Sequence, residues 1–157
     1  MFDEVNHMRL TTTTNVSVDG VMQGLGGAEE DRRGGVERGG WAIPLLETET
    51  GDYLSQVYSG AAAFLFGRRT YEIFAPYWGV MIDPSTNPIA AALNRRPKYV
   101  ASASLTDPQW AGTTVLQGDL ATAIGELKAH HDGDLPGVLT TKRPRSTRRM
   151  CSEAAAV

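Results

Sequence analysis

The stretch at residues 61–71, AAAFLFGRRTY, constrains the fold of this chain more than any other part of the sequence. Its apolar run stops at Gly67, a pattern typical of a strand that is covered on both faces in a parallel sheet. The residues after Gly67 predict a helix that begins at once. A buried strand that continues directly into a helix indicates an α/β fold.

The junction at Gly67 has the features of an anion site. Glycine lets the backbone come close to a ligand, and the free N–H groups and positive dipole at a helix N-terminus attract anions. Arg68 and Arg69 add side-chain donors that suit phosphate oxygens. These residues indicate a nucleotide-like ligand. The alternative is a buried strand followed by an ordinary solvent-exposed arginine pair.

Strand and helix patterns alternate along the chain, which predicts a mostly parallel sheet with flanking helices in three layers. Further strands are expected at residues 10–19, 98–102 and 113–116. Helices are expected at residues 50–60, at 70–75 before Pro76, at 88–94 with Asn87 as the cap, and after the cap residue Asp119.

Residues 10–19, LTTTTNVSVD, alternate strictly between two faces, and their β-branched side chains favour a strand. Asn15, Ser17 and Asp19 share one face, and Asp19 ends the strand beside Gly20. Ligands of open α/β sheets lie at strand ends, so these side chains are candidates for a ligand pocket. The alternative is the solvent-exposed polar face of an edge strand.

Residues 20–40 contain eight glycines and predict a long loop. A loop of this length is usually a lid, a binding loop or disordered. Its glycines form no phosphate-loop signature, because no Gly-Lys-Ser/Thr sequence is present. Trp41 then re-enters the core or lines a pocket.

The composition, with 157 residues of which 41% are hydrophobic and 21% charged, predicts one globular domain. A net charge of -3 does not favour nucleic acid or an anionic membrane as a partner. The sequence has a single cysteine, Cys151, and neither a signal peptide nor a spanning segment, so we expect a cytoplasmic protein. His130 and His131 predict no metal site, because adjacent loop residues chelate poorly without a third ligand.

The charge changes sign near the C-terminal end. Residues 1–135 hold 10 basic and 17 acidic residues, whereas residues 136–157 hold 5 basic residues and one acidic residue. The segment VLTT, residues 138–141, suits the beginning of a strand, but no apolar periodicity follows it. We therefore expect a leader at residues 1–7, a domain at 8–137 and a basic disordered tail at 138–157, with Pro136 as its first sign.

Four stretches in this order resemble dihydrofolate-reductase-like proteins: TTTTNVSVDG, the glycine-rich loop ending in GGWA, FLFGRRTYE and PKYVASASL. The bacterial type concerned is similar to the C-terminal reductase domain of the bifunctional riboflavin-biosynthesis deaminase/reductase. The resemblance covers residues 8–135. It implies a dihydrofolate-reductase-like sheet, NADPH as the cofactor, a small-molecule substrate and a homodimer.

The same resemblance implies roles for particular residues. The phosphates of NADPH would lie at Gly67, Arg68, Arg69 and Thr70, and its adenosine end would lie beside Ser102 and Ser104. The nicotinamide and substrate would face Asn15, Ser17, Asp19 and Gly20, beneath a lid that ends at Trp41. Asp19 would orient the substrate or relay a proton.

The chain departs from this family after residue 137. The family continues with a strand, a Gly-Ser-Gly or Gly-Gly turn that holds the cofactor pyrophosphate, a helix and closing strands. The glycine turn is absent here. We therefore expect a truncated or frameshifted relative whose sheet is incomplete at the C-terminus.

The resemblance implies a reductase that transfers hydride from NADPH to a pyrimidine or pteridine type of heterocycle. The reaction would be like that of 5-amino-6-(5-phosphoribosylamino)uracil reductase or of dihydrofolate reductase. The alternatives are a truncated inactive remnant and a non-enzymatic binding protein. A nucleic-acid-binding tail is less favoured, because one short basic run lacks the aromatic side chains that stack on bases.

Overall fold

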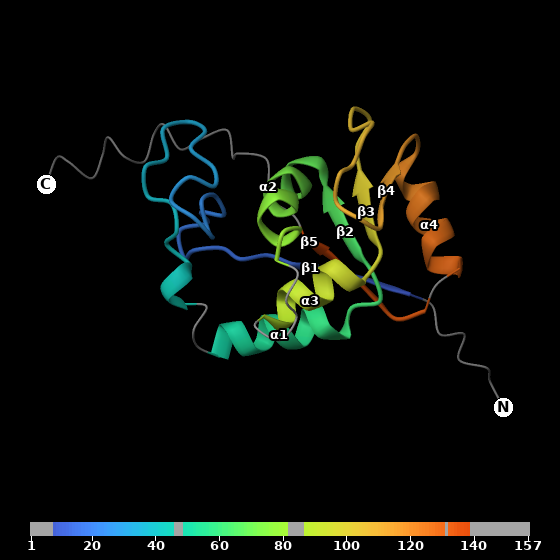
Figure 1. Ribbon diagram of the computed structural model, residues 1–157, viewed down its shortest axis with the longest axis horizontal. Helices are drawn as coiled ribbons and strands as arrows, with labels where there is room; N and C mark the ends of the chain where they lie inside the picture. Colours follow the sequence, from blue (N-terminus) through green and yellow to red (C-terminus); the bar gives the residue numbers. More distant parts are fainter. Residues whose placement is uncertain (1–7, 46–48, 82–86, 131, 139–157) are drawn as a thin grey trace, which may run out of the picture.

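The computed structural model describes residues 8–45, 49–81, 87–130 and 132–138. Within them, five parallel strands form one sheet in the order β1-β5-β2-β3-β4 (Figure 1). The strands are β1 (Arg9–Thr13), β2 (Phe64–Gly67), β3 (Lys98–Ala101), β4 (Thr113–Leu116) and β5 (Asp134–Val138). The helices are α1 (Glu49–Gly60), α2 (Arg68–Trp78), α3 (Pro88–Arg95) and α4 (Leu120–His130), with a 3-10 turn η1 (Ile43–Leu45).

Helices pack on both faces of the sheet. On one face, α1, α2 and α3 pack around a cluster that includes Phe64 and Phe66. On the other face, Ile124 and Leu127 of α4 pack on a cluster that includes Leu65. The predicted three-layer α/β fold with a parallel sheet is therefore confirmed.

Strand β2 is buried on both faces, as its apolar run predicts. Phe64 and Phe66 have no exposed surface, and Leu65 is 7% exposed. The regular strand begins at Phe64, because Ala61 forms only an isolated bridge with Asp134. Gly67 ends the strand and is at the same time the N-cap of α2.

The other short predicted elements are confirmed with shifts of a residue or so. Asn87 caps α3, since its side-chain oxygen accepts hydrogen bonds from the amides of Ile89 (3.0 Å) and Ala90 (3.1 Å). Asp119 caps α4 by accepting a hydrogen bond from the amide of Thr122 at 2.8 Å. Short polar side chains before helices were thus reliable sequence signals.

The first strand is shorter than its alternating pattern predicts. It ends at Thr13, opposite Val138 of β5, so residues 14–19 form no strand. Val16 and Val18 are exposed there. A strand needs a hydrogen-bonded neighbour as well as alternation, and the described part of β5 ends at Val138.

Helix α2 continues past Pro76 to Trp78, whereas the sequence predicts an end before the proline. Phe74, Ala75 and Trp78 all pack against the apolar cluster. Their burial on both sides of Pro76 outweighs the hydrogen bond that proline cannot donate. Gly79 is the C-cap of the helix, and its amide donates a hydrogen bond to the carbonyl of Ala75 at 3.0 Å.

Strand β5 corrects the predicted end of the domain. Pro136 and Val138 belong to this buried strand rather than to a tail. Proline is tolerated because β5 pairs with β2 only at Gly137 and Val138, after the position that lacks an N–H. The leader at residues 1–7 and the rest of the predicted tail, residues 139–157, lie outside the described residues.

A buried cation lies at the start of β3. The Lys98 ammonium donates hydrogen bonds to the carbonyls of Leu93 and Arg96, both at 2.9 Å, and lies 4.9 Å from the Trp110 ring centroid. It therefore caps the C-terminal end of α3. Burial lowers the pKa of Lys98 from 10.5 to about 8. None of the described helices is long and apolar enough to cross a membrane.

Leu135→Ala should lower the free energy of unfolding by about 2–5 kcal/mol, because it leaves a cavity beneath an inner strand. Leu135 has no exposed surface. Leu120→Ala is the matched control: Leu120 is 41% exposed, so its loss should be within about 0.5 kcal/mol. Urea denaturation measures both, and equal small losses would place residue 135 outside the core.

Stability should rise between pH 8 and pH 10 through Lys98. Its folded pKa of about 8 lies below its ordinary value of 10.5, so the unfolded chain binds the proton more readily in this interval. Lys98→Met should flatten that rise. Urea denaturation at steps from pH 7.5 to 9.5 measures the slope, and identical slopes in both proteins would contradict this origin.

Candidate functional site

Strands β2, β3 and β4 end in register, so their carboxyl ends lie together at one edge of the sheet. Gly67 of β2 lies opposite Ala101 of β3, and Ala101 lies opposite Leu116 of β4. Whatever follows each strand is therefore brought together at this edge. After β2 comes Arg68, the first residue of α2, and after β3 comes Ser102.

Arg68 joins two of these segments. Its Nη1 donates to the hydroxyl of Ser104 in the segment after β3, and its Nε donates to Glu72 Oε1 at 2.6 Å, one turn further along α2. Both side chains of this ion pair are about half exposed. The guanidinium is thus held at the surface and keeps donors for an oxyanion.

Ser102 shapes the turn that presents Ser104. Its hydroxyl oxygen accepts hydrogen bonds from the amides of Ser104 (3.2 Å) and Leu105 (3.0 Å). Of the predicted cofactor residues, the structure therefore groups Gly67, Arg68, Ser102 and Ser104. Their proximity follows from parallel pairing of β2 with β3.

The N-terminus of α2 faces the same edge. The N-cap residue of this helix is Gly67, which has no side chain with which to cap it. Gly67 has an extended backbone, with φ of -75° and ψ of 155°. A Cβ at this position would meet no atom within 4 Å. Open space beside the first turn of a helix is what an anion at a helix N-terminus requires.

The chain changes sides of the sheet at this edge. The loop after β3 packs on the face of α1–α3 through Leu105 and Trp110, whereas α4 after β4 packs on the opposite face. Neighbouring parallel strands that continue onto opposite faces open a crevice at their carboxyl ends, where open α/β sheets bind ligands. The Arg68–Ser104 pair lies at the same carboxyl ends, after β2 and β3.

Arg69 and Thr70 do not join this group. Thr70 is buried, with 1% of its surface exposed. Arg69 lines an open pocket of about 400 Å³ between α2 and the glycine-rich loop (residues 20–40), together with Glu30, Asp31, Arg32, Arg33, Glu72 and Ile73. Successive residues on a helix point in different directions, so Arg68 and Arg69 serve different surfaces.

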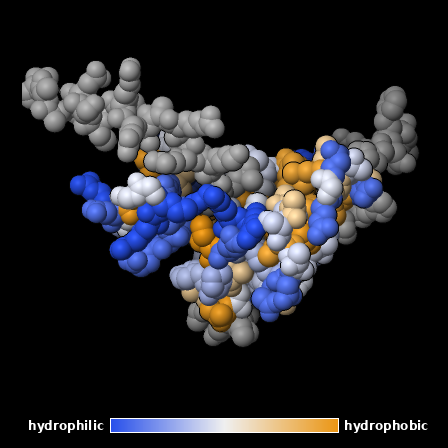
Figure 2. Space-filling model, turned by 90° about the horizontal axis from the view of Figure 1, so that it is seen from above, coloured by the Kyte–Doolittle hydropathy of each residue, from blue (hydrophilic) through white to orange (hydrophobic). Residues whose placement is uncertain are grey.

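The glycine-rich loop is folded on itself. Gln23 Nε2 donates to the carbonyls of Asp31 (3.0 Å) and Arg33 (2.7 Å), and Trp41 Nε1 donates to the carbonyl of Gln23 at 3.1 Å. A hydrogen bond from the Arg33 side chain lowers the pKa of Asp31. Figure 2 shows that the visible surface of this region, at the left, is largely hydrophilic.

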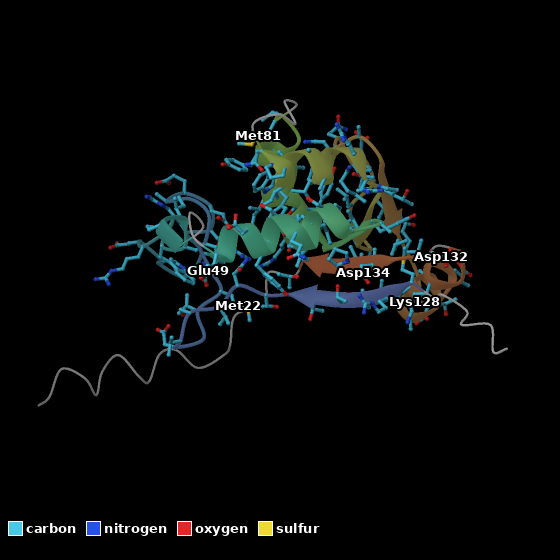
Figure 3. All side chains as sticks on the ribbon, turned by 90° about the horizontal axis from the view of Figure 1, so that it is seen from below. Met22, Glu49, Met81, Lys128, Asp132 and Asp134 are labelled. Atoms are coloured by element: carbon cyan, nitrogen blue, oxygen red, sulfur yellow. The ribbon has the colours of Figure 1, made fainter. Side chains whose placement is uncertain are left out.

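The predicted substrate residues lie beyond the end of β1. In Figure 3, β1 and β5 run side by side with their carboxyl ends toward Met22 of the glycine-rich loop and their amino ends near Lys128 and Asp132. The segment 17–21 is a tight turn in which Ser17 Oγ accepts from the Val21 amide at 2.8 Å and donates to Asp19.

This turn belongs to the same end of the sheet as the Arg68–Ser104 pair but is not one of the pocket walls. Asn15, Asp19 and Gly20 are exposed, and Gly20 has a positive φ of 83° that suits the turn. Trp41 is half-buried and holds the glycine-rich loop together through its indole N–H. The predicted roles in substrate binding or catalysis stay predictions for five residues: Asn15, Ser17, Asp19, Gly20 and Trp41.

Several residues on these surfaces were not predicted from the sequence. Glu72 could have been found from its spacing of four residues after Arg68, which favours an ion pair on a helix. Ile73 and the acidic and basic residues 30–33 line the separate pocket beside Arg69, and only tertiary packing brings them together. In the described part of the chain, no group of three or more His, Cys, Asp and Glu side chains could hold a metal ion.

Comparison of the sequence with models of protein families and with curated proteins gives no match. The resemblance to dihydrofolate-reductase-like proteins thus stays a prediction that depends on the quoted motifs.

Gly67→Ala should change the free energy of unfolding by less than about 0.5 kcal/mol, because neither its backbone nor its surroundings require glycine. Gly79→Ala at the other end of α2 is the matched control. A Cβ there would clash with the carbonyl of Ala75, so this variant should be clearly less stable. Thermal melting compares the two, and an equal loss would contradict the open space at Gly67.

Proposed function

We propose that the chain binds NADPH at the Arg68–Ser104 edge and acts as a reductase of a pyrimidine or pteridine type of heterocycle, as in dihydrofolate-reductase-like proteins. The observation that carries this proposal is the combination of a helix N-terminus that begins at Gly67, where the N-cap has no side chain, with Arg68 and Ser104 from the neighbouring strand ends. Amides, a guanidinium and a hydroxyl are the donors that phosphate oxygens accept from.

The residues present suit a phosphorylated nucleotide. Arg68 would exchange its bond to Ser104 for bonds to a phosphate, and Ser104 would donate its hydroxyl to the same group. Glu72 would keep the guanidinium oriented through its 2.6 Å bond. NADPH supplies the hydride when bound, and the protein orients it and its acceptor.

The acceptor would lie toward the glycine-rich loop and the turn at residues 17–21. Ser17 and Asp19 are joined by a hydrogen bond, and Asp19 is exposed. A carboxylate in that position would orient a heterocycle through its ring N–H groups or pass a proton to it. Asn15, Gly20 and Trp41 are the further substrate-binding candidates.

A non-enzymatic binding protein or an inactive remnant is the competing hypothesis. It shares the fold but predicts no turnover of NADPH. Thermal melting with increasing NADPH, followed by absorbance at the nicotinamide band with pyrimidine and pteridine acceptors, separates the hypotheses. Absence of any stabilisation at saturating NADPH would reject the reductase.

Arg68→Ala should weaken NADPH binding by about tenfold or more, because a hydrogen bond to a charged group contributes roughly 1.5–3 kcal/mol. Arg95→Ala is the matched control, since Arg95 is an exposed arginine in the last turn of α3. Fluorescence titration with NADPH and NADH measures both variants. Equal affinities of Arg68→Ala and the unmodified protein would remove Arg68 from the site.

Gly67→Ala gives an independent check of the same site. Its methyl group would occupy the open space beside the first amides of α2 and should weaken NADPH binding several-fold while leaving the melting temperature nearly unchanged. Unchanged affinity would show that no ligand approaches this turn closely.

A further inference from the structure

The segment between β3 and β4 crosses the sheet without a helix. This β3–β4 loop (residues 102–112) leaves the carboxyl end of β3 and returns to the start of β4, where the Gly112 carbonyl accepts from the Lys98 amide at 2.9 Å. The loop has Ser102 and Ser104 at its beginning and Trp110 near its end. It contains no helix or strand, and the turn at Ser102 is the local structure that presents Ser104.

The first turn of α2 holds this loop at two places. At the surface, Arg68 Nη1 donates to Ser104 Oγ. In the core, the amide of Trp110 donates to the hydroxyl of Tyr71 at 3.0 Å, and the two rings lie 6.3 Å apart. Tyr71 and Trp110 are only 4% and 5% exposed. One helical turn therefore contacts the loop near both ends.

Trp110 is itself fixed from a second direction. Its indole N–H donates to Asn94 Oδ1 at 2.8 Å. The amide nitrogen of Asn94 donates to the carbonyls of Trp78 (2.8 Å) and Met81 (2.9 Å). This arrangement links α3, the end of α2 and the β3–β4 loop, so the Trp110 backbone has little freedom while Tyr71 accepts its N–H.

The two attachments respond differently to a ligand. A phosphate at Arg68 competes for the exposed bond to Ser104, and exposed contacts of this kind stabilise little. The buried bond to Tyr71 is remote from solvent and stays. It then becomes the attachment that keeps the loop, and with it Ser104, at the correct distance from Arg68.

We infer that the Tyr71 hydroxyl is a positioning group that holds the β3–β4 loop so that Ser104 faces Arg68. The part of this inference that concerns ligand affinity depends on the proposed NADPH site. The part that concerns the loop does not. Tyr71 would act through Ser104 without touching the ligand.

Tyr71→Phe tests the inference, because it removes the acceptor and keeps the ring. We expect NADPH affinity to fall by about tenfold, the scale of one buried donor left unsatisfied. In the unliganded protein, hydrogen exchange of the Ser104, Leu105 and Trp110 amides should become faster. The matched control is Tyr58→Phe, which removes a hydroxyl from the same apolar cluster on α1 and should change neither quantity.

A double-mutant cycle with Ser104→Ala separates positioning from general stability. If Tyr71 acts through Ser104, the loss caused by Tyr71→Phe should largely disappear when Ser104 is already alanine. Additive losses in the double variant would overturn the positioning role. Loss of cooperative melting in Tyr71→Phe would overturn it too, since the hydroxyl would then be a requirement for folding.

The two proposals fail in different ways. If the unmodified protein does not bind NADPH, the proposed function is rejected, and faster exchange confined to the β3–β4 loop in Tyr71→Phe still supports the positioning role. If NADPH binds and Tyr71→Phe leaves both affinity and loop exchange unchanged, the positioning role is rejected and the proposed function stands.

Discussion

The insertion of β5 between β1 and β2 is the interaction on which the rest of the structure depends. Among the described strands, β1 pairs only with β5, along all five residues from Arg9 to Thr13. The glycine-rich loop continues from β1, so its position beside α2 depends on β5 as well. The exposed Arg9–Asp134 ion pair, at 2.8 Å, joins the first residues of the two strands and adds little stability.

Parallel pairing also explains why the candidate site exists. Parallel strands end at the same edge, so residues that are 36 positions apart, Arg68 and Ser104, form a hydrogen bond. Beneath this exposed pair, the buried Tyr71–Trp110 hydrogen bond and the contacts of Asn94 hold the β3–β4 loop. This loop connects two parallel strands without a helix. Because these buried contacts fix the loop, the exposed donors of Arg68 and Ser104 stay accessible to a ligand.

The sequence predicted a large part of this arrangement from local signals. The apolar run before Gly67 identified a strand buried on both faces, and Asn87 and Asp119 identified helix starts. Gly67, Arg68, Ser102 and Ser104 were grouped through a family resemblance, and the structure brings them together. Arg69 and Thr70 were grouped with them, yet Arg69 faces the glycine-rich loop and Thr70 is buried.

By itself, the sequence determined most of the strands and helices, with the exception of β5, and that the sheet is mostly parallel, because apolar periodicity and capping act over a few residues. The tertiary structure alone decided where β1 ends, that α2 runs through Pro76, and that Pro136 and Val138 lie in an inner strand. It also decided the separate directions of Arg68 and Arg69. These features depend on neighbours distant in sequence, whose packing energies exceed local preferences and leave no short-range pattern.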